Sequence, residues 1–252
     1  MMTSTISRTK RIVKGLIAAA FWLCIWQLAA TAVDLPLLLP GPVAVWEALT
    51  ELAGEETFWA QVGLTLLRIL GGFAMGAVAG FLVAVLTSFS SLGEMLLSPA
   101  IRIIRATPVA SFILLCMLWL KSGFLPAFIA GLMVMPVVWG NVSEGFQQTD
   151  AQLLEMARVY GMSRIKTFFV LYLPSVIPYF RAACLTAMGM AWKSGVAAEV
   201  LCQPRKSVGT GLYFAKIYLE TPNLFAWTAV VIVLSVVVEK LFAAAFRHLG
   251  SH

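Results

Sequence analysis

Six long apolar runs, separated by short polar segments, restrict the fold of this chain more than any other feature of its sequence. They cover residues 12–33, 62–88, 105–120, 124–142, 175–201 and 224–246. A helix needs about 20 apolar residues to cross the hydrocarbon core of a membrane. The third run is short, but Arg102 and Arg105 at its start can extend their side chains toward the interface. The pattern predicts an all-α, polytopic membrane helix bundle of about six transmembrane helices, in one domain spanning residues 1–252.

Composition supports a membrane protein and excludes several other classes. Apolar residues make up 60% of the chain and charged residues 12%, about half the charged share of a soluble domain. The net charge of +6 is spread over short clusters, which favours a role in membrane topology over nucleic-acid binding. The four cysteines form no CxxC or Cys/His pair, so no disulfide or metal site is expected. The first apolar run lacks a small-residue cleavage site, which favours a retained span over a signal peptide.

The placement of Lys and Arg predicts that both termini face the cytoplasm. With six spans, four basic clusters fall on one side: the N-terminal tail, the segment around Arg102, residues 158–166, and the C-terminus with Arg247. Cytoplasmic loops carry such an excess of basic residues. The first outer loop is acidic, with four Glu between residues 47 and 56, whereas the basic residues between 205 and 216 are a mild exception.

Three glycines form a regular stripe in the second apolar run. Gly72, Gly76 and Gly80 are spaced by four residues, which places them on one face of a helix. Small residues at this spacing let the backbone of a neighbouring helix approach closely. We expect the stripe to be a helix-packing seam.

A polar segment of about residues 143–174 interrupts the apolar pattern between the fourth and fifth runs. Thr149 followed by Gln152 has the spacing of a capping box, Gly161 can stop the helix, and Ser163 can cap a second short helix. The expected apolar face consists of Leu153, Leu154, Ala157 and Tyr160. From these residues alone three interpretations stay open: a helix resting in lipid headgroups, an ordinary structured loop, and a helix that docks on a soluble partner.

The same segment resembles the loop that marks the membrane subunits of bacterial ABC importers. That pattern is Glu-Ala-Ala, three residues, Gly, nine residues, then Ile-x-Leu-Pro. Glu155, Ala157, Gly161 and Pro174 match at the correct spacing, while Met156 replaces the first alanine and Leu171 the isoleucine. Residues 39–49, 65–80, 191–201 and 209–215 are also similar to permeases of the nitrate/sulfonate/taurine group. The resemblance implies a type I ABC importer fold in which two copies form the translocation pathway.

The resemblance also implies a mechanism and a set of partners. The chain has no GxxxxGK[ST] phosphate loop, so ATP and Mg²⁺ would bind to a separate dimer of ABC ATPase subunits and the chain itself is expected to be no enzyme. Partners would include a second permease copy, a periplasmic or lipid-anchored substrate-binding protein, and the lipid of a bacterial cytoplasmic membrane. The residues expected to couple to the ATPase are Leu153, Glu155, Met156, Ala157, Arg158, Tyr160, Gly161, Arg164 and Pro174.

Charged residues inside membrane spans are costly and often functional. Lys193 lies toward the outer end of the fifth run, with Glu199 just beyond it. Lys193 either contacts Glu199 or snorkels outward, or it lines the pathway and attracts an anionic substrate. Arg68 and Arg181 are expected near the cytoplasmic third, as snorkelling or gate residues. The candidate pathway residues are therefore Lys193, Glu199 and Arg181, for a small anionic or organic solute of the nitrate, sulfonate, taurine or vitamin-precursor type.

Two other functions are weighed against an importer subunit. The alternative is an ATP-independent secondary transporter or channel, but no internal repeat and no carboxylate deep inside a span support it. An intramembrane enzyme is disfavoured because the sequence lacks HExxH, GxSxG and a carboxylate pair within a span.

Overall fold

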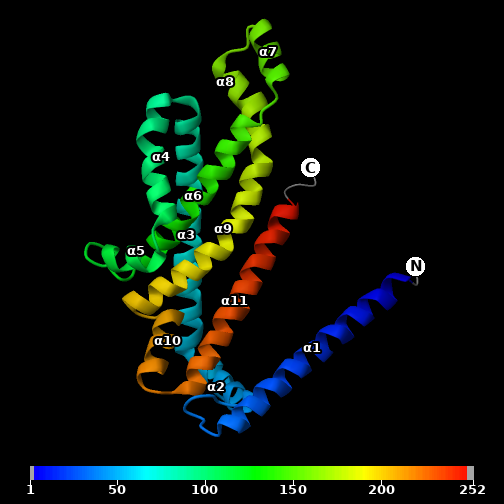
Figure 1. The fold of residues 1–252 in the computed structure, drawn as a ribbon, viewed down its shortest axis with the longest axis vertical. Coiled ribbons are helices and arrows are strands. Elements are labelled where there is room, and N and C mark those ends of the chain that lie inside the picture. The colour runs from blue at the N-terminus through cyan, green and yellow to red at the C-terminus, as the bar shows by residue number, and fades with distance from the viewer. Residues whose placement is uncertain (1–2, 249–252) are drawn as a thin grey trace. The chain divides into compact units, whose positions relative to one another are not determined.

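The computed structural model describes the backbone of residues 3–248 and the side chains of residues 13–246. Basic residues before residue 13 and Arg247, which the predicted topology uses, lie outside the described side chains. Within the described range every regular element is a helix (Figure 1), which confirms the all-α prediction. The helices are α1 (Thr3–Val33), α2 (Pro42–Gly54), α3 (Glu56–Phe89), α4 (Ser91–Ala106), α5 (Val109–Cys116), α6 (Leu125–Gln147), α7 (Ala151–Val159), α8 (Arg164–Thr167), η1 (Phe168–Tyr172), α9 (Leu173–Cys202), α10 (Val208–Ile217) and α11 (Thr221–His248).

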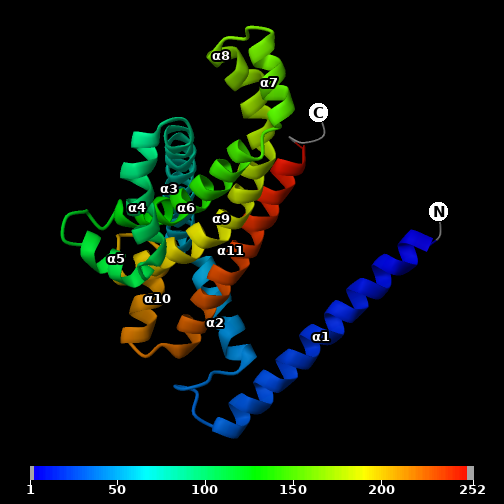
Figure 2. The same ribbon diagram turned by 45° about the horizontal axis from the view of Figure 1, so that its top comes forward.

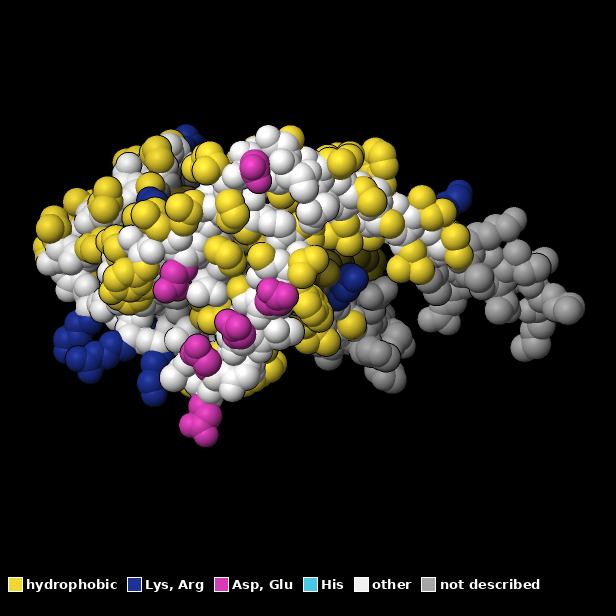
Figure 3. Space-filling view, turned by 90° about the horizontal axis from the view of Figure 1, so that it is seen from below, with side chains coloured by type: hydrophobic (Ala, Val, Ile, Leu, Met, Phe, Trp, Pro, Cys, Tyr) yellow, Lys and Arg dark blue, Asp and Glu magenta, His cyan; other side chains and the backbone are white. Residues whose placement is uncertain are grey.

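Five helical stretches of the described chain are long and apolar enough to cross a membrane. They are Val13–Val33, Glu56–Phe89, Leu125–Gln147, Arg164–Cys202 and Thr221–Phe246. The third of these stretches holds fully buried Ile129, Val134 and Val138, whereas α1 exposes most of its apolar side chains. Hydrophobic side chains cover large parts of the face drawn in Figure 3. Such a surface requires lipid or other protein to cover it.

The expected third span, residues 105–120, differs from the structure in its bounds. The structure instead has α4 and α5, which together satisfy the length and composition of a span but bend by 107° between them. The cause is Pro108, which lacks a backbone N–H and forces the preceding residue out of the helical region. Thr107 is accordingly extended, with φ −82° and ψ 132°. Counted as one broken span, this pair brings the total to six.

The chain forms two compact units, and each is described by itself. The first comprises Met1–Trp59 and Gly211–Val230. Its core is a small cluster of Val45, Ala48 and Ala226, with Trp26 and Phe225 packed against it. The Trp26 indole stacks on the Phe225 ring at 6.0 Å between centroids and donates a hydrogen bond to the Pro40 carbonyl. This unit thereby ties the end of α1 to the start of α11.

The second unit comprises Ala60–Thr210 and Val231–His252. In it α6 packs along α9, and α4 folds back beside α3 (Figures 1 and 2). One end of this unit carries α7 and α8, and the other carries the loop after α9 (Figure 1).

The glycine stripe of α3 lies directly against the backbone of α6, as predicted. A Cβ atom on any of the three glycines would overlap α6, because Gly72 faces Ala127, Gly76 faces Gly131 and Gly80 faces Met135. Gly131 reciprocates, since a Cβ there would come within 2.8 Å of the Gly72 carbonyl oxygen. The two backbones therefore approach more closely than any residue with a side chain permits, which gives them strong dispersion contacts without a hydrophobic driving force.

Substituting Gly76 with Ala should push α3 and α6 apart and destabilise the protein by about 1–3 kcal/mol, the usual cost of overpacking. Gly71→Ala is the matched control, because a Cβ on the adjacent Gly71 meets nothing within 4 Å. Thermal unfolding of both variants in detergent measures the effect. Equal melting temperatures for the two variants would contradict the seam.

Candidate functional site

Asp150 starts the helix α7. Its side chain accepts a hydrogen bond from the backbone N–H of Gln152 at 2.8 Å, which satisfies one of the unpaired donors at a helix start. The predicted capping box at Thr149 is wrong. Thr149 is buried, and its hydroxyl donates to the carbonyl of Gly145 on the preceding helix. Asp takes the cap because its carboxylate is the stronger acceptor and the following turn is open to solvent.

Gly161 ends the helix, as predicted, through a Schellman arrangement. The Met162 N–H donates to the Ala157 carbonyl at 2.9 Å, and the Gly161 N–H donates to the Arg158 carbonyl at 3.0 Å. Gly161 has φ of +64°, a left-handed conformation that glycine adopts without a steric cost. Ser163 then caps α8, since its hydroxyl accepts from the Lys166 N–H. Residues 150–167, which we call the elbow, thus have each turn fixed by a named hydrogen bond.

The predicted apolar face of α7 is not buried as one surface. Leu154 is partly buried and Ala157 is buried, so these two face the rest of the unit. The outward face is an apolar row with large exposed fractions: Leu153 43%, Met156 54%, Val159 84% and Tyr160 78%. Glu155 is exposed beside this row. Met156, which replaces the alanine of the resembled pattern, therefore points away from the unit rather than into it.

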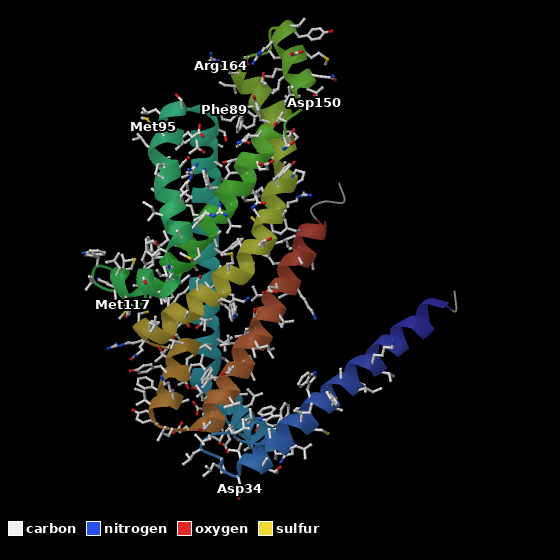
Figure 4. The ribbon with its side chains drawn as sticks, viewed as in Figure 1. Asp34, Phe89, Met95, Met117, Asp150 and Arg164 are labelled. Atoms are coloured by element: carbon white, nitrogen blue, oxygen red, sulfur yellow. The ribbon has the colours of Figure 1, made fainter. Side chains whose placement is uncertain are left out.

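An aromatic cluster attaches the elbow to the membrane helices. The ring of Phe89, the last residue of α3, lies 5.0 Å from Tyr172, 5.2 Å from Phe146 and 5.9 Å from Phe168 between centroids. These are edge-to-face contacts, each worth about 0.5–1.5 kcal/mol beyond area burial. Phe89 lies below the elbow in Figure 4. The cluster joins the ends of α3 and α6 to η1.

A groove of about 720 Å³ lies between the elbow and the end of α3. Arg158 and Arg164, two of the predicted coupling residues, line it together with Leu154 and Ala157. Both arginines are exposed. Pro174, the last predicted coupling residue, follows the π-helical turn η1 by two residues, within the continuous helical stretch Arg164–Cys202.

A buried ion pair occupies the opposite end of the same unit. Glu199 on α9 is fully buried, and its carboxylate accepts from the Arg68 guanidinium at 3.3 Å. The Thr65 hydroxyl donates to the same carboxylate at 2.8 Å, and the Gly209 N–H at 3.2 Å. A carboxylate taken out of water in this way is stable only because several donors replace its hydration shell.

Arg68 also holds the loop that follows α9. Its guanidinium donates to the Arg205 carbonyl at 3.0 Å and to the Lys206 carbonyl at 3.2 Å. Together these contacts hold α3, α9, the loop 203–207 and the start of α10 in fixed positions relative to one another. Arg68 lies at the end of the unit opposite to the elbow (Figure 1), so the two expectations that both are near the cytoplasmic face cannot hold together. Thr65 and Gly209 were missed, since neither carries a sequence signal for pairing with a distant carboxylate.

Removing the arginine of this pair should destabilise the second unit by about 2–4 kcal/mol, because the buried carboxylate loses its counter-ion. We expect Arg68→Met to lower the melting temperature and to make the loop 203–207 accessible to protease. Arg205→Met is the control, since only the backbone of the exposed Arg205 joins the network. A variant of Arg68 as stable as the control would show that the ion pair contributes nothing.

The predicted pathway residues do not form one cluster. Glu199 lies inside the network, so it exposes no surface to a pathway in this chain and it does not contact Lys193. Lys193 is exposed on α9 and has no ion pair among the described side chains. Arg181 is partly buried nearer the elbow end of the same helix. No group of three His, Cys, Asp or Glu side chains in the described range could hold a metal ion.

The family of this chain is identified by comparison with known protein families. The profile of the binding-protein-dependent transport system inner membrane components matches residues 76–250. The chain belongs to this family. It is a multi-pass inner-membrane permease subunit of a binding-protein-dependent ABC importer, and such subunits are not catalytic.

Two relatives and one solved structure give this permease its context. It is 28% identical over 216 residues to SsuC of Escherichia coli (strain K12), a permease named for aliphatic sulfonates, covering 82% of each chain. It is 24% identical over 230 residues to the taurine transport system permease protein TauC of the same strain, covering 89% of this chain and 83% of TauC. Its fold matches a bacterial alginate ABC transporter solved with an alginate pentasaccharide-bound periplasmic protein, with a TM-score of 0.60, 14% identity, and coverage of 99% and 98%.

Proposed function

We propose that this permease imports a small anion of the sulfonate type and that a separate ATPase subunit drives it by binding the elbow. The observation that carries the proposal is the exposed apolar row on α7. The proposed pathway is completed by a second copy of the chain, and ATP and Mg²⁺ bind to the ATPase.

The apolar row fits a protein partner better than water. Val159 and Tyr160 are more than three-quarters exposed, and neighbouring Met156 and Leu153 extend the row over two turns of α7. An amphipathic helix with anchors at this spacing suits a hydrophobic groove. In an importer family, the partner that must be reached is the ATPase. Glu155, Arg158 and Arg164 flank the row and supply polar contacts at its rim.

The elbow is rigid enough to transmit a movement to the membrane helices. Its helices are capped, its turn is closed by the Gly161 hydrogen bonds, and the Phe89 cluster fixes it to α3 and α6. A movement of the bound ATPase would therefore reposition the membrane helices instead of only bending a loop.

The proposed orientation places the elbow in the cytoplasm. Arg158, Arg164 and Lys166 gather at this end, in agreement with the excess of basic residues in cytoplasmic loops. Six crossings, with α4 and α5 counted as one, then bring both termini to the cytoplasmic side. The loop 203–209 faces outward, where a periplasmic or lipid-anchored binding protein delivers the substrate.

The substrate class rests on the relatives and on charge. SsuC is named for aliphatic sulfonates and TauC for taurine, which is itself a sulfonate. Lys193 is a cation without a described partner on the long helix α9, and it stays our prediction for a pathway residue that attracts the anion.

Replacing an outward apolar residue of α7 with a charged one should prevent docking. We expect Met156→Lys to reduce co-purification of the ATPase subunit by about tenfold or more, which corresponds to the 1.4 kcal/mol or more that burying an unpaired ammonium costs. Ala151→Lys is the control, because it adds the same charge at an exposed position of the same helix that lies away from the apolar row.

The same preparation tests the function as a whole. In proteoliposomes that also contain the ATPase and the binding protein, uptake of labelled taurine or ethanesulfonate should require ATP and should fall with Met156→Lys. Uptake that continues without any ATPase subunit would instead identify an ATP-independent transporter.

A further inference from the structure

The loop 203–207 carries basic residues on a side of the membrane where such residues are disfavoured. It connects α9 to the start of α10, at the end of the second unit opposite to the elbow (Figure 1). In the proposed orientation this end faces outward. Arg205 and Lys206 lie in the loop and are exposed. Because Lys and Arg in short loops favour the cytoplasmic side, membrane topology gives no reason for these two cations, and they require another one.

The backbone of this short loop is strained at two positions. Gln203 has φ of 47° and Lys206 has φ of 54°, in the left-handed region that residues other than glycine seldom adopt. Such conformations persist only where the surrounding structure over-determines them, and they concentrate at functional sites. The loop is therefore held in one particular shape instead of relaxing into an unstrained turn.

The buried ion-pair network supplies this constraint. The Arg68 guanidinium donates to the carbonyl oxygens of Arg205 and Lys206, and the Thr210 hydroxyl donates to the Pro204 carbonyl at 2.8 Å. These hydrogen bonds fix the backbone at three successive positions of the loop. They use carbonyl oxygens only, so the side chains of the two cations have no part in holding the loop.

The two cationic side chains are not neutralised by the second unit. Neither forms an ion pair among the described side chains, and Glu199, the acid nearest to them in sequence, is fully buried. Lys121 is a further exposed cation of this end, since the carbonyl of the adjacent Ser122 accepts a hydrogen bond from the Cys202 thiol at 3.6 Å. These three cations thus belong to one end of the unit.

The shape of this end favours a large partner over a small anion. Figure 3 views the molecule from the end opposite to the elbow, and Lys and Arg side chains project from one edge of that face. Sites for small molecules are concave and enclose most of the ligand. Projecting cations instead suit contact with the surface of another protein.

We propose that Arg205, Lys206 and Lys121 form a docking surface for an acidic patch on the substrate-binding protein. The proposal rests on the proposed import function and names the chemistry by which the importer recognises its delivery partner. Complementary charges steer a protein toward its docking site and raise the association rate. A loop that is already rigid also loses little conformational entropy when the partner binds.

The test measures how fast the ethanesulfonate-loaded binding protein associates with the permease–ATPase complex in phosphatidylcholine nanodiscs. We expect Arg205→Gln/Lys206→Gln to lower the association rate constant about tenfold at low salt, the lower end of the range for electrostatic steering. The difference should vanish at about 1 M salt, where the screening length is about 3 Å. The melting temperature should stay at the wild-type value, because the network contacts only the carbonyl oxygens of these residues.

A matched pair of single variants controls for the loss of charge. Lys206→Gln and Lys240→Gln each remove one exposed lysine, the latter from α11, and only Lys206→Gln should slow association at low salt. Equal association rates for the wild type and the double variant, with ATP-coupled uptake intact, would overturn the docking surface alone.

Three further outcomes would also count against the proposal. Slower uptake with an unchanged association rate would assign the cations to the free anion. A slower rate seen only in nanodiscs that contain phosphatidylglycerol would assign them to lipid headgroups. Absence of any association between the wild-type complex and the binding protein, together with absence of ATP-coupled uptake, would contradict the proposed import function and this proposal with it.

Discussion

The close approach of α3 to α6 is the contact on which the rest of the second unit depends. Gly72, Gly76 and Gly80 allow the two backbones to touch, and this contact fixes the position of α3 relative to the bundle. The two ends of α3 then serve different purposes. Arg68, near one end, holds Glu199 and the loop after α9. Phe89, at the other end, holds the elbow. One helix therefore connects the proposed docking surface to the opposite end of the unit, about 30 Å away for the 21 residues between them at 1.5 Å per residue.

This arrangement connects the elbow rigidly to the membrane helices. Each of its parts is fixed locally: Asp150 and Ser163 cap the helices, and the left-handed Gly161 closes the turn. The Phe89 cluster then connects the segment that follows the elbow to the ends of α3 and α6. The apolar row that begins at Leu153 stays exposed on the elbow. An exposed apolar surface of this kind is typical of a site that a partner covers.

The sequence predicted the helical class, the long apolar spans, the glycine seam and the glycine turn of the elbow, because each depends on a local pattern of 4 to 20 residues. It failed where the outcome depends on distant partners. The third span is a separate, local error of bounds, because its first helix begins at Ser91 instead of residue 105 and the bend follows at Pro108. The face of α7 turned outward differs from the expected one, because Leu154 and Ala157 are covered by the rest of the unit whereas Leu153 and Tyr160 are exposed. Glu199 was expected near Lys193, six residues and more than a helical turn away, yet its partner is Arg68 on another helix.

In the proposed mechanism α7 binds the ATPase and lies in the cytoplasm. Accessibility of a cysteine at Val159 tests both statements together, in a Cys24→Ser background because Cys24 is the exposed native thiol of the described chain. In the purified permease alone, Val159→Cys should react rapidly with a membrane-impermeant maleimide, since Val159 is 84% exposed. In the complex with the ATPase the reaction should be suppressed, and intact cells should show no labelling. Equal labelling with and without the ATPase, or labelling of intact cells from outside, would contradict the account.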